Sequence, residues 1–512
     1  VFINESTCGS SSSFNNPAIM INDKDNYYLF NLIYSGNHKS IVENDHNNTT
    51  RLLIGMNDFM LNISLKENET FTTPEAVLTL GEELNEIRNN SHHFIKDNIL
   101  RNKEEFPIIF NSWEAAYFNL NKNNWKKLAS HASRVGAEVF VFDDGWFGKR
   151  SDETTSLGDW TLNEDKLDSF EEIRNYLHSI NLKFGLWIEP EMVSEKSEFF
   201  EKYPSFAMKN SDISPILMRH QLLLDLANPA CVNYLIETLS KLFKESGVEY
   251  VKWDFNRLFS DIYSPSMRGG NYVYKYYEGL YRLMSEIVQR FPHIYFEGCA
   301  SGGARYDLGI LYYFDVIWTS DGTDARERID IQVGTSSVYP LSSISNNISC
   351  SPNHQTGKRS LLDDRINVAL MGEMGMELNL DIESKNTLNE IKKAFNYYKK
   401  KRNLILEGDS YLYTSKNILS LGSVRPNKAE AIYLIVSYNK EYKAVKFLGL
   451  DDNKNYRLSF RNQQNITSES FPELNGKFLR EKGITISQLF NETGQENNEI
   501  NIATRIIYLE AK

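Results

Sequence analysis

Residues 231–257 are CVNYLIETLSKLFKESGVEYVKWDFNR, and this stretch contains the unit from which the fold is built. Apolar residues recur at helical spacing from Cys231 to Phe243, which predicts an amphipathic helix. A short apolar run, Val248–Trp253, follows, and a carboxylate, Asp254, stands directly behind it. A helix followed by a short buried strand is the repeating unit of an α/β protein with a parallel sheet.

The same alternation extends over the middle of the chain. The apolar runs that we interpret as strands are 107–110, 139–142, 184–187, 222–224, 248–253, 294–296 and 316–318, with 343–349 as the eighth. Helix-like segments lie between them, for example 167–180, 231–243 and 274–289. Repeated strand–helix units of this kind predict a (β/α)8 TIM barrel, which we assign to residues 96–405.

The segments on both sides of the barrel have the pattern of β structure. Residues 1–95 carry apolar runs between Asn, Asp and Gly clusters, at 27–34 and 51–56, and end in a helical pattern over about 80–97. Residues 406–512 show similar runs at 410–414, 431–437 and 506–509. We therefore expect part of an N-terminal β-sandwich at 1–95, the barrel at 96–405 and a C-terminal antiparallel β-sandwich domain at 406–512.

Composition narrows the classes of function. The 512-residue chain has 41% hydrophobic and 24% charged residues, which is ordinary for a globular protein. Its formal net charge of −12 disfavours generic nucleic-acid binding, which needs clustered Lys and Arg. The four cysteines form no C-x-x-C pair, and no apolar stretch reaches the ~18 residues of a membrane span. No signal-peptide pattern follows Val1, and we expect a cytoplasmic protein with no nucleic-acid or membrane partner.

Polar residues follow the predicted strands, at the ends where a barrel keeps its chemistry. These exits are NSWE at 111–114, DDGW at 143–146, WIEPE at 187–191, DLAN at 225–228, DFNR at 254–257, EGC at 297–299 and SDGTD at 320–324. Carboxylates and amides suit a polyhydroxyl ligand because they hydrogen-bond to hydroxyls, and indoles cover the apolar face of a sugar. Some of these residues, taken one at a time, have a simpler structural explanation. Asp225 and Asp324 are credible helix caps, and Trp187 and Trp253 are credible core residues.

Helix capping does not explain well why Asp143 and Asp144 are adjacent, or why Asp254 lies within the motif KWDFNR. Two adjacent acids repel each other unless a ligand or a cation shares them. Lys252 lies on the same strand face as Asp254 and would keep that carboxyl ionised, as a nucleophile requires. Asp321, two predicted strands further on, is the natural partner, since a retaining glycosidase needs a carboxylate and a carboxylic acid roughly 5–5.5 Å apart. The charge of the first would raise the pKa of the second.

The motifs together resemble one known family. NSWEA (111–115), FDDGWFG (142–148), LGDW (157–160), GLWIEPEMV (185–193), LDLANP (224–229), VKWDFNR (251–257), WTSDGTD (318–324) and PNHQTG (352–357) are similar to motifs of glycoside hydrolase family 36 α-galactosidases, the bacterial melibiose and raffinose type. The resemblance covers nearly the whole chain. It implies a catalytic TIM barrel and an N-terminal β-supersandwich that begins before Val1, so we expect the chain to be N-terminally truncated.

The resemblance also implies roles for individual residues. It makes Asp254 the nucleophile and Asp321 the acid/base of a retaining hydrolase. The substrate-binding residues that it implies are Asp143 and Asp144 on the O4 and O6 side of the sugar, Trp187 as a wall of the ring, Arg219 from the loop before 222–224, Lys252 and Asn256 beside the nucleophile, and Cys299 and Gly302 near the C2 hydroxyl. We expect no metal or other cofactor, since the nine histidines form no evident ligand cluster.

Two positions depart from the family pattern. Gly322 replaces the usual Asn after the acid/base residue, and Ala304 precedes Arg305 where the family commonly has Gly or Asn. The smaller residue at 322 could open room near C2, so hydrolysis of α-N-acetylgalactosaminides is a second hypothesis. A non-catalytic galactoside-binding fragment, and transglycosylation as in the related plant raffinose synthases, are further alternatives. The expected partner is an oligosaccharide or glycoside substrate, and the family implies a homo-oligomer, often a tetramer.

Overall fold

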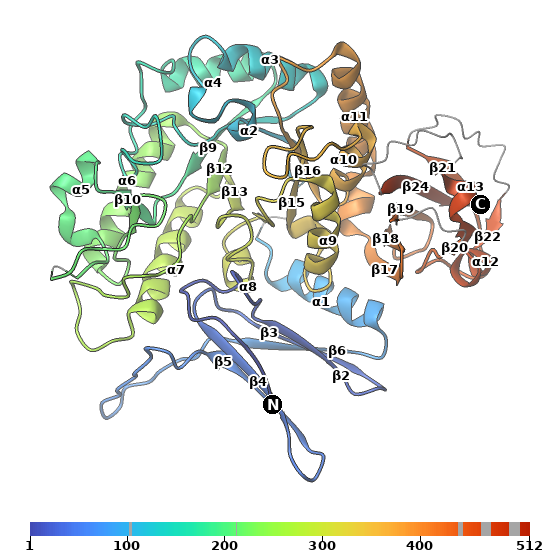
Figure 1. The fold of residues 1–512 in the computed structure, drawn as a ribbon, viewed down its shortest axis with the longest axis horizontal. Helices are drawn as coiled ribbons and strands as arrows, with labels where there is room; N and C mark the ends of the chain where they lie inside the picture. The colour runs from blue at the N-terminus through green and yellow to red at the C-terminus, as the bar shows by residue number, and fades with distance from the viewer. Residues whose placement is uncertain (102–104, 211, 439–443, 462–472, 491–501) are drawn as a thin grey trace.

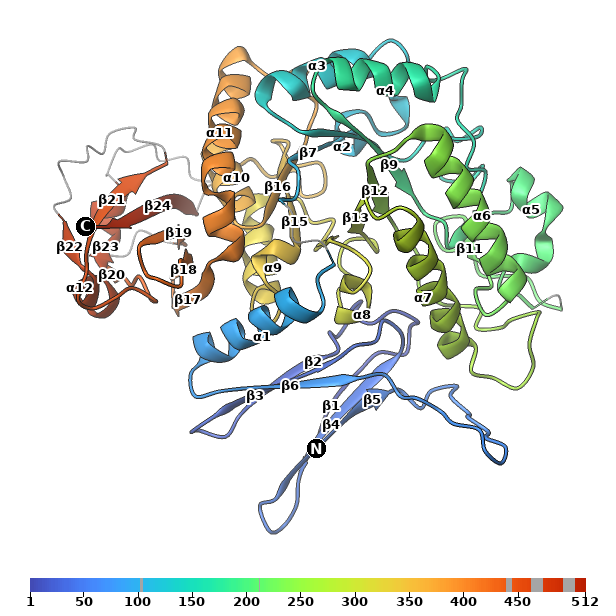
Figure 2. The same ribbon diagram turned by 180° about the vertical axis from the view of Figure 1, so that it is seen from behind.

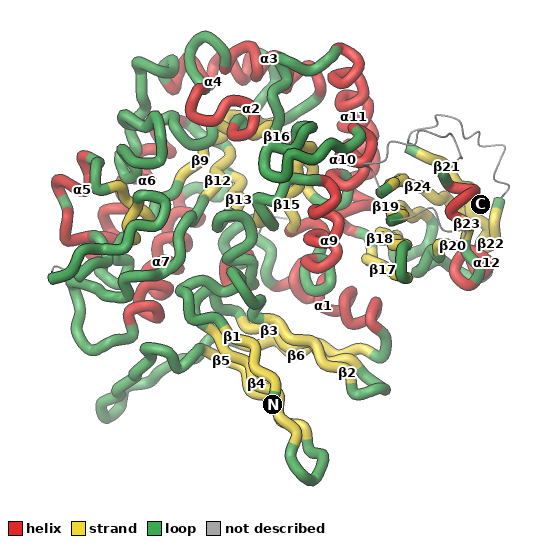
Figure 3. The backbone as a smooth tube through the Cα atoms, in the orientation of Figure 1, coloured by secondary structure: helices red, strands yellow, loops and turns green. Residues whose placement is uncertain are grey.

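The computed structural model describes residues 1–512 with the exception of 102–104, 211, 439–443, 462–472 and 491–501. Its centre is a closed barrel of eight parallel strands that are hydrogen-bonded in chain order (Figure 1, Figure 3). Helices surround the barrel, and β regions from the two ends of the chain flank it (Figure 2). The predicted (β/α)8 TIM barrel between two β regions is confirmed.

The barrel strands alternate with helices along the chain. The strands are β7 (Ile109–Asn111), β8 (Val139–Phe142), β9 (Lys183–Ile188), β12 (Tyr250–Trp253), β13 (Tyr295–Gly298), β14 (Val316–Trp318), β15 (Ile344–Ser349) and β16 (Glu373–Glu377). The helices and 3-10 turns between and after them are α2 (Trp113–Ala116), η1 (Tyr117–Asn119), α3 (Trp125–Val135), α4 (Phe170–Ser179), α5 (Glu198–Lys202), η2 (Pro204–Phe206), α6 (Pro229–Ser246), α7 (Tyr272–Arg290), α8 (Leu308–Leu311), α9 (Ala325–Thr335), η3 (Leu341–Ser343), α10 (Leu362–Ala369) and α11 (Lys385–Glu407). All four residues of β8 are buried, because helices cover one face of each strand and the barrel interior the other.

One predicted barrel strand lies outside the barrel. The run Leu222–Leu224 overlaps β11 (Gln221–Leu223), which pairs antiparallel with β10 (Met192–Ser194) in a separate two-stranded sheet. All three residues of the run are buried, so their hydrophobicity reports burial and does not identify the strand with which they pair. The assignment of Leu222–Leu224 to the barrel is wrong.

The strand that completes the barrel instead is β16, with the sequence EMGME. Glutamate is usually exposed, so Glu373 and Glu377 made this segment look like part of the surface rather than a buried strand. Both glutamates are in fact buried, with exposed fractions of 6% and 3%. The count of strands shifts as a result. Asp254 follows the fourth barrel strand and Asp321 the sixth, and the two remain two strands apart.

The N-terminal region forms two three-stranded antiparallel sheets, which lie below the barrel in Figure 1. One sheet contains β1 (Phe2–Glu5), β4 (His38–Asn44) and β5 (Thr50–Met56), and the other contains β2 (Ala18–Asn22), β3 (Tyr27–Leu32) and β6 (Ala76–Gly81). Helix α1 (Leu84–Asn98) follows and packs against β3, β6 and the C-terminal strand β17 (Asp409–Ser415). It therefore connects the N-terminal sheets with the C-terminal region.

The C-terminal region is an antiparallel sheet of six strands beside α10 and α11 (Figure 2). Its strands are, in spatial order, β17 (Asp409–Ser415), β18 (Ile418–Val424), β19 (Glu430–Ser437), β24 (Ala503–Ala511), β21 (Asn455–Phe460) and β22 (Leu474–Asn475). A smaller sheet pairs β20 (Ala444–Val445) with β23 (Ile484–Thr485), and two short helices, α12 (Gly476–Glu481) and α13 (Ile486–Leu489), interrupt the β structure. The sequence pattern, which indicated only strands over residues 406–512, did not predict these two helices.

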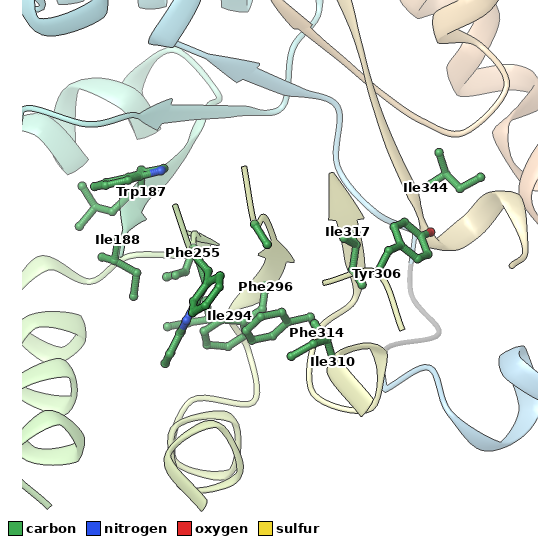
Figure 4. Packing of buried hydrophobic residues seen from close by; sticks show 14 of the residues in the cluster. Trp187, Ile188, Phe255, Ile294, Phe296, Tyr306, Ile310, Phe314, Ile317 and Ile344 are labelled. Atoms are coloured by element: carbon green, nitrogen blue, oxygen red, sulfur yellow. The ribbon is translucent and has the colours of Figure 1, made fainter. Parts of the chain in front are cut away.

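Aromatic and aliphatic side chains pack together around the barrel strands (Figure 4). Phe296 of β13 stacks on Phe314, with ring centroids 6.0 Å apart and planes at 11°. The indole of Trp253 lies 5.7 Å from the same Phe314 ring. This packing holds β12 and β13 rigidly, and so positions the polar residues at their ends. Within the described residues, none of the helices has the length and apolar character that crossing a membrane requires.

Candidate active site

The ends of the barrel strands surround a cavity of about 220 Å³. Nine of the ten predicted site residues line it: Asp143, Asp144, Trp187, Arg219, Lys252, Asp254, Asn256, Cys299 and Asp321. Residues that sequence reasoning did not select complete the lining: Trp113, Glu114, Tyr117, Trp318, Thr323, His354, Gln355 and Glu377. The fold therefore brings together residues from most of the chain between 113 and 377 at a single site.

Asp254 stands directly after β12 with both carboxylate oxygens hydrogen-bonded. The backbone N–H of Phe255 donates to Oδ1 at 2.8 Å. The indole N–H of Trp187 and the side-chain amide of Asn256 donate to Oδ2, at 3.1 and 2.6 Å. Three donors of this kind fix the orientation of the carboxylate and favour its charged form.

Electrostatics keep Asp254 ionised. Burial by itself would raise the pKa of this carboxyl, but the charge of Lys252 and hydrogen bonds from Cys299, Asn256 and the Phe255 backbone outweigh burial. The pKa of Asp254 is therefore lowered from its ordinary value. An ionised carboxylate in a closed site is the form that attacks an electrophilic carbon.

Asp321, after β14, has the opposite bias. Burial raises the pKa of its carboxyl, and the negative charge of Asp254 raises it further, against smaller opposing effects that include the charge of Lys252. The indole N–H of Trp318 donates to Oδ1 at 3.1 Å. Two carboxyls in one cavity with pKa values displaced in opposite directions are the pattern expected of a nucleophile and an acid.

Lys252 forms its ion pair with Asp143, with 3.1 Å between Nζ and Oδ2. The side-chain amide of Asn111 donates to the same oxygen at 2.7 Å. Burial lowers the pKa of Lys252, but the carboxylates of Asp143 and Glu377 raise it well above its ordinary value. The lysine is thus a fixed positive charge, and it acts on the neighbouring Asp254 through space.

Asp144 has a cation of its own. The guanidinium of Arg150 donates to its two carboxylate oxygens, from Nε at 2.9 Å and from Nη2 at 2.8 Å. Arg150 is 2% exposed, so this bidentate pair is shielded from water. The repulsion expected within the tandem is therefore relieved by two separate cations, Lys252 for Asp143 and Arg150 for Asp144.

The other predicted residues occupy distinct parts of the cavity wall. The ring of Trp187 lines the cavity and is nearly parallel to that of Phe147, at 8°. Arg219 has a φ of 52° in the turn before β11, and its guanidinium pairs with Glu153 at 2.8 Å. Cys299 follows β13 and is 5% exposed.

Gly302 is the predicted site residue that does not line the cavity. Its φ is 84°, and a Cβ at this position would lie 2.6 Å from the backbone nitrogen of Asp321. A glycine is needed there because the loop after β13 passes directly over the end of β14. Gly302 thus contacts the backbone that carries Asp321.

The two predicted helix caps have different outcomes. Asp324 caps α9, since its carboxylate accepts from the N–H of Arg326 at 3.0 Å. Asp225 is not a cap: α6 begins after Asn228, and Asp225 accepts from the hydroxyls of Ser264 and Ser266 instead, at 2.6 and 3.0 Å. The Asn-Pro pair at the start of α6 was the better signal.

Several lining residues were missed by sequence reasoning for identifiable reasons. Glu377 ends β16, the strand that was not recognised, and burial raises its pKa to about 8. Trp113 and Glu114 follow the first predicted strand, and His354 and Gln355 belong to the PNHQTG motif. The sequence therefore marked these residues as part of recognisable motifs, but nothing in it indicated that they line the cavity. The expectation that no histidine joins a ligand cluster is wrong for His354, because potential ligand atoms of Glu114, Cys350 and His354 lie within 4.8 Å of one another.

Comparison with known families agrees with the geometry of the cavity. The melibiase family matches residues 70–408, and the N-terminal domain of glycosyl hydrolase family 36 matches residues 1–66. The chain belongs to glycoside hydrolase family 36. The resemblance inferred from the sequence motifs is confirmed by this match.

Individual members of family 36 are similar to this chain in sequence and in structure. It is 38% identical over 470 residues to α-galactosidase 1 of Pediococcus pentosaceus, an alignment that covers 88% of the chain and 64% of the relative. The crystal structure of the family 36 α-galactosidase AgaA from Geobacillus stearothermophilus has a TM-score of 0.93 at 33% identity, over 100% of this chain and 71% of AgaA. Variants of AgaA have been solved in complex with raffinose and with stachyose. The chain thus spans somewhat less than two thirds of the curated relative's length.

Proposed function

We propose that this family 36 chain is a retaining exo-α-galactosidase that hydrolyses terminal, non-reducing α-galactosides of the melibiose and raffinose type. The observation that carries the proposal is the pair of carboxyls in one cavity, with the pKa lowered for Asp254 and raised for Asp321. A double displacement needs one ionised and one protonated carboxyl at the same time. The α-galactosidase relatives and the raffinose complex of AgaA support the choice of substrate.

The first half of the reaction transfers the sugar to the protein. The ionised Asp254 attacks the anomeric carbon, while Asp321 donates its proton to the glycosidic oxygen as that bond breaks. A β-galactosyl ester on Asp254 is the product of this step. Trp187 and Asn256, which donate to Oδ2 of Asp254, hold the carboxylate in place during the attack.

The second half releases the sugar. Asp321, now ionised, removes a proton from a water molecule that attacks the same carbon, and α-galactose leaves with the configuration of the substrate. Asp143 and Asp144 are each neutralised by a buried cation and retain free lone pairs for hydrogen bonds from sugar hydroxyls. Arg219 and Cys299 complete the set of polar groups that face the ring.

A substitution of the nucleophile tests the mechanism. Asp254→Gly should abolish hydrolysis of p-nitrophenyl α-galactoside, and azide should restore part of the activity by replacing the carboxylate. Asp165→Gly, at an exposed acid away from the cavity, is the matched control and should keep normal activity. Proton NMR of the first product should show α-galactose. Undiminished turnover in Asp254→Gly, or β-galactose as first product, would contradict the proposal.

The same protein preparation separates the remaining alternatives. A side chain at position 322 would point toward Ser320, Glu327 and Ile331, which do not line the cavity, so the missing side chain of Gly322 opens no room near C2. A paired assay with the N-acetyl analogue should therefore favour the galactoside. Free galactose as the main product in excess sucrose excludes transglycosylation, whereas galactose binding without any product would indicate a non-catalytic fragment.

Assembly and location are further parts of the proposal. We expect a homo-oligomer, and the outer face of β6 supports a contact there, because Leu78 and Leu80 are 52% and 53% exposed. Light scattering of the purified protein gives the mass that tests this. A cytoplasmic location stays a prediction from the sequence.

A further inference from the structure

Three potential metal ligands meet on one side of the cavity. Glu114 lies in α2 directly after β7, Cys350 follows β15, and His354 lies in the loop that leads to α10. One ligand atom from each of the three residues lies within 4.8 Å of the other two. Glu114 and His354 also line the cavity, so the cluster opens toward the proposed substrate site.

The donor types in this cluster are those that zinc prefers. Thiolate, imidazole and carboxylate ligands together select a borderline or soft divalent cation over Mg²⁺ or Ca²⁺, which bind through oxygen atoms. Bond lengths of about 2.0–2.3 Å put the ligand atoms of a tetrahedral zinc roughly 3.3–3.8 Å apart. The sulfur of Cys350 lies 3.7 Å from Oε2 of Glu114, which is within this range. His354, the third residue of the cluster, is exposed to solvent.

Neighbouring side chains already orient two of the three ligands. The hydroxyl of Thr323 donates to Oε1 of Glu114 at 2.9 Å, which leaves Oε2 on the side of Cys350. The phenolic oxygen of Tyr117 lies 2.5 Å from Nδ1 of His354. Hydrogen bonds of this kind, behind the ligand atoms, are a regular feature of protein metal sites and fix the orientation of histidine and carboxylate ligands.

The charge around the cluster also favours a cation. Among the described residues, the cavity is lined by six acidic side chains and by two Lys or Arg side chains, Lys252 and Arg219. Because the three ligands come from the protein, a tetrahedral ion would keep one position open toward the cavity. That position would be occupied by water or by a sugar hydroxyl.

We propose that Glu114, Cys350 and His354 form a binding site for one thiophilic divalent cation, for which Zn²⁺ is the best fit. Binding replaces the thiol proton of Cys350 by the metal, and the proton is released to solvent. The ion and its open-position ligand take up space in a cavity of about 220 Å³, on the side where Gln355 contacts the backbone of Asp321. The metal is therefore a reversible inhibitor of the proposed hydrolysis.

Direct metal binding tests the site without reference to activity. Metal-free protein titrated with Zn²⁺ in a calorimeter should bind one ion per chain. Co²⁺ should bind at the same place and show thiolate-to-metal absorption in the near ultraviolet. Cys350→Ser should remove this absorption, and His354→Ala, at an exposed position, should weaken Zn²⁺ binding by more than the roughly 10–100-fold that a change behind the ligands costs. Cys8→Ser removes a cysteine from the N-terminal region and should change neither.

An activity measurement tests the inhibitory role, and this part alone rests on the proposed hydrolase function. Zn²⁺ should inhibit hydrolysis of p-nitrophenyl α-galactoside, EDTA should restore it, and Cys8→Ser should be inhibited like the wild type. Inhibition of His354→Ala should require correspondingly more Zn²⁺. Absence of stoichiometric binding to the wild type, or binding and inhibition that persist unchanged in both Cys350→Ser and His354→Ala, would overturn the proposal. Failure of the hydrolase proposal would leave the binding result intact.

Discussion

Two carboxyls of the same chemical type, Asp254 and Asp321, are biased toward opposite protonation states by their surroundings. Asp254 receives three hydrogen bonds and lies near the fixed charge of Lys252. Asp321 receives one indole N–H and lies near the negative charge of Asp254 itself. The ionisation of the first residue thus helps to keep the second protonated, so the two groups titrate as a coupled pair.

The pH dependence of the proposed hydrolysis follows from these shifts. Asp254 must be ionised, and its lowered pKa places the acidic limb of kcat/KM below the ordinary carboxyl value. Asp321 must be protonated for the first step, and because its pKa is raised, activity is lost as pH rises through that pKa. Asp321→Asn should lower kcat/KM for raffinose by about 10²–10⁴ and remove this basic limb. If the basic limb of the pH profile is unchanged in Asp321→Asn, the loss of activity at high pH arises from the titration of another group.

Glu189 is a buried carboxyl whose titration affects stability. Burial, followed by the charge of Asp254, raises its pKa from the ordinary 4.5 to about 8. Its Oε1 accepts from the backbone of Asn256 at 2.6 Å and from the side chain of Gln221 at 2.9 Å.

A group that is protonated in the folded protein but ionised in the unfolded chain stabilises the fold below its unfolded pKa. This contribution disappears as pH rises through the folded pKa. The free energy of unfolding should therefore fall between about pH 4.5 and pH 8, and Glu189→Gln, which stays neutral, should make the fall shallower. Thermal unfolding at a series of pH values measures this, and equal slopes in the two proteins would contradict it.

At the scale of elements, helices hold the strand ends that carry the site. Arg328 of α9 donates to the hydroxyl of Thr319 at 2.7 Å and to the carbonyl oxygens of Ser320 and Ser345, at 3.0 and 3.1 Å. Its guanidinium also lies over the ring of Trp318, 4.2 Å from the centroid. One buried side chain thus ties β14, which precedes the proposed acid/base residue, to β15.

Two glycines inside helices should respond in opposite ways to the same substitution. A methyl group at Gly279 of α7 would lie 1.8 Å from the carbonyl oxygen of Leu226, so Gly279→Ala forces the helix away and should destabilise the protein by about 1–3 kcal/mol. Gly334 of α9 has open space around it, so Gly334→Ala should stabilise by a few tenths to about 1 kcal/mol. Urea unfolding of both variants provides the comparison, and a loss at Gly334 as large as that at Gly279 would contradict the packing argument.

At the scale of the whole molecule, a buried carboxyl joins the N-terminal sheets to the barrel. Asp307 caps α8, is fully buried, and accepts hydrogen bonds from the hydroxyls of Ser11 and Ser35 at 2.5 and 2.7 Å. The hydroxyl of Tyr277 in α7 also donates to the backbone oxygen of Gly9. The N-terminal region therefore meets the barrel through specific buried polar contacts.

Removal of this carboxyl should loosen the N-terminal region. Asp307→Ala leaves the two serine hydroxyls without their acceptor and should lower the free energy of unfolding by roughly 1–3 kcal/mol. Asp23→Ala is the matched control, because Asp23 is exposed and accepts hydrogen bonds within its own turn. Urea unfolding and limited proteolysis of the N-terminal sheets should both distinguish the variants, and equal losses would show that the contact does not join the two regions.

The hydrophobic pattern of the sequence predicted most of the barrel strands. A strand that is covered on both faces consists mainly of apolar residues, so it appears in the sequence as a short apolar run. The pattern failed where burial and pairing diverge. Leu222–Leu224 is apolar but belongs to a small antiparallel sheet, and β16 closes the barrel although two of its five residues are glutamates. Side-chain chemistry alone cannot separate these cases, because the partner strand is distant in sequence.

The carboxylates of the site could be predicted as well. Residues that directly follow parallel strands meet at one end of a barrel, and this does not depend on the conformation of the loops. The amino-acid order by itself therefore determined the barrel, the family and the positions of Asp254 and Asp321 at strand ends two strands apart. Tertiary structure alone decided which charges meet: Arg150 with Asp144, Lys252 with Asp143, and Glu114 with Cys350 and His354. The physical reason is that ion pairing and ligand geometry depend on distances of a few ångströms between loops, and only the packed chain defines those distances.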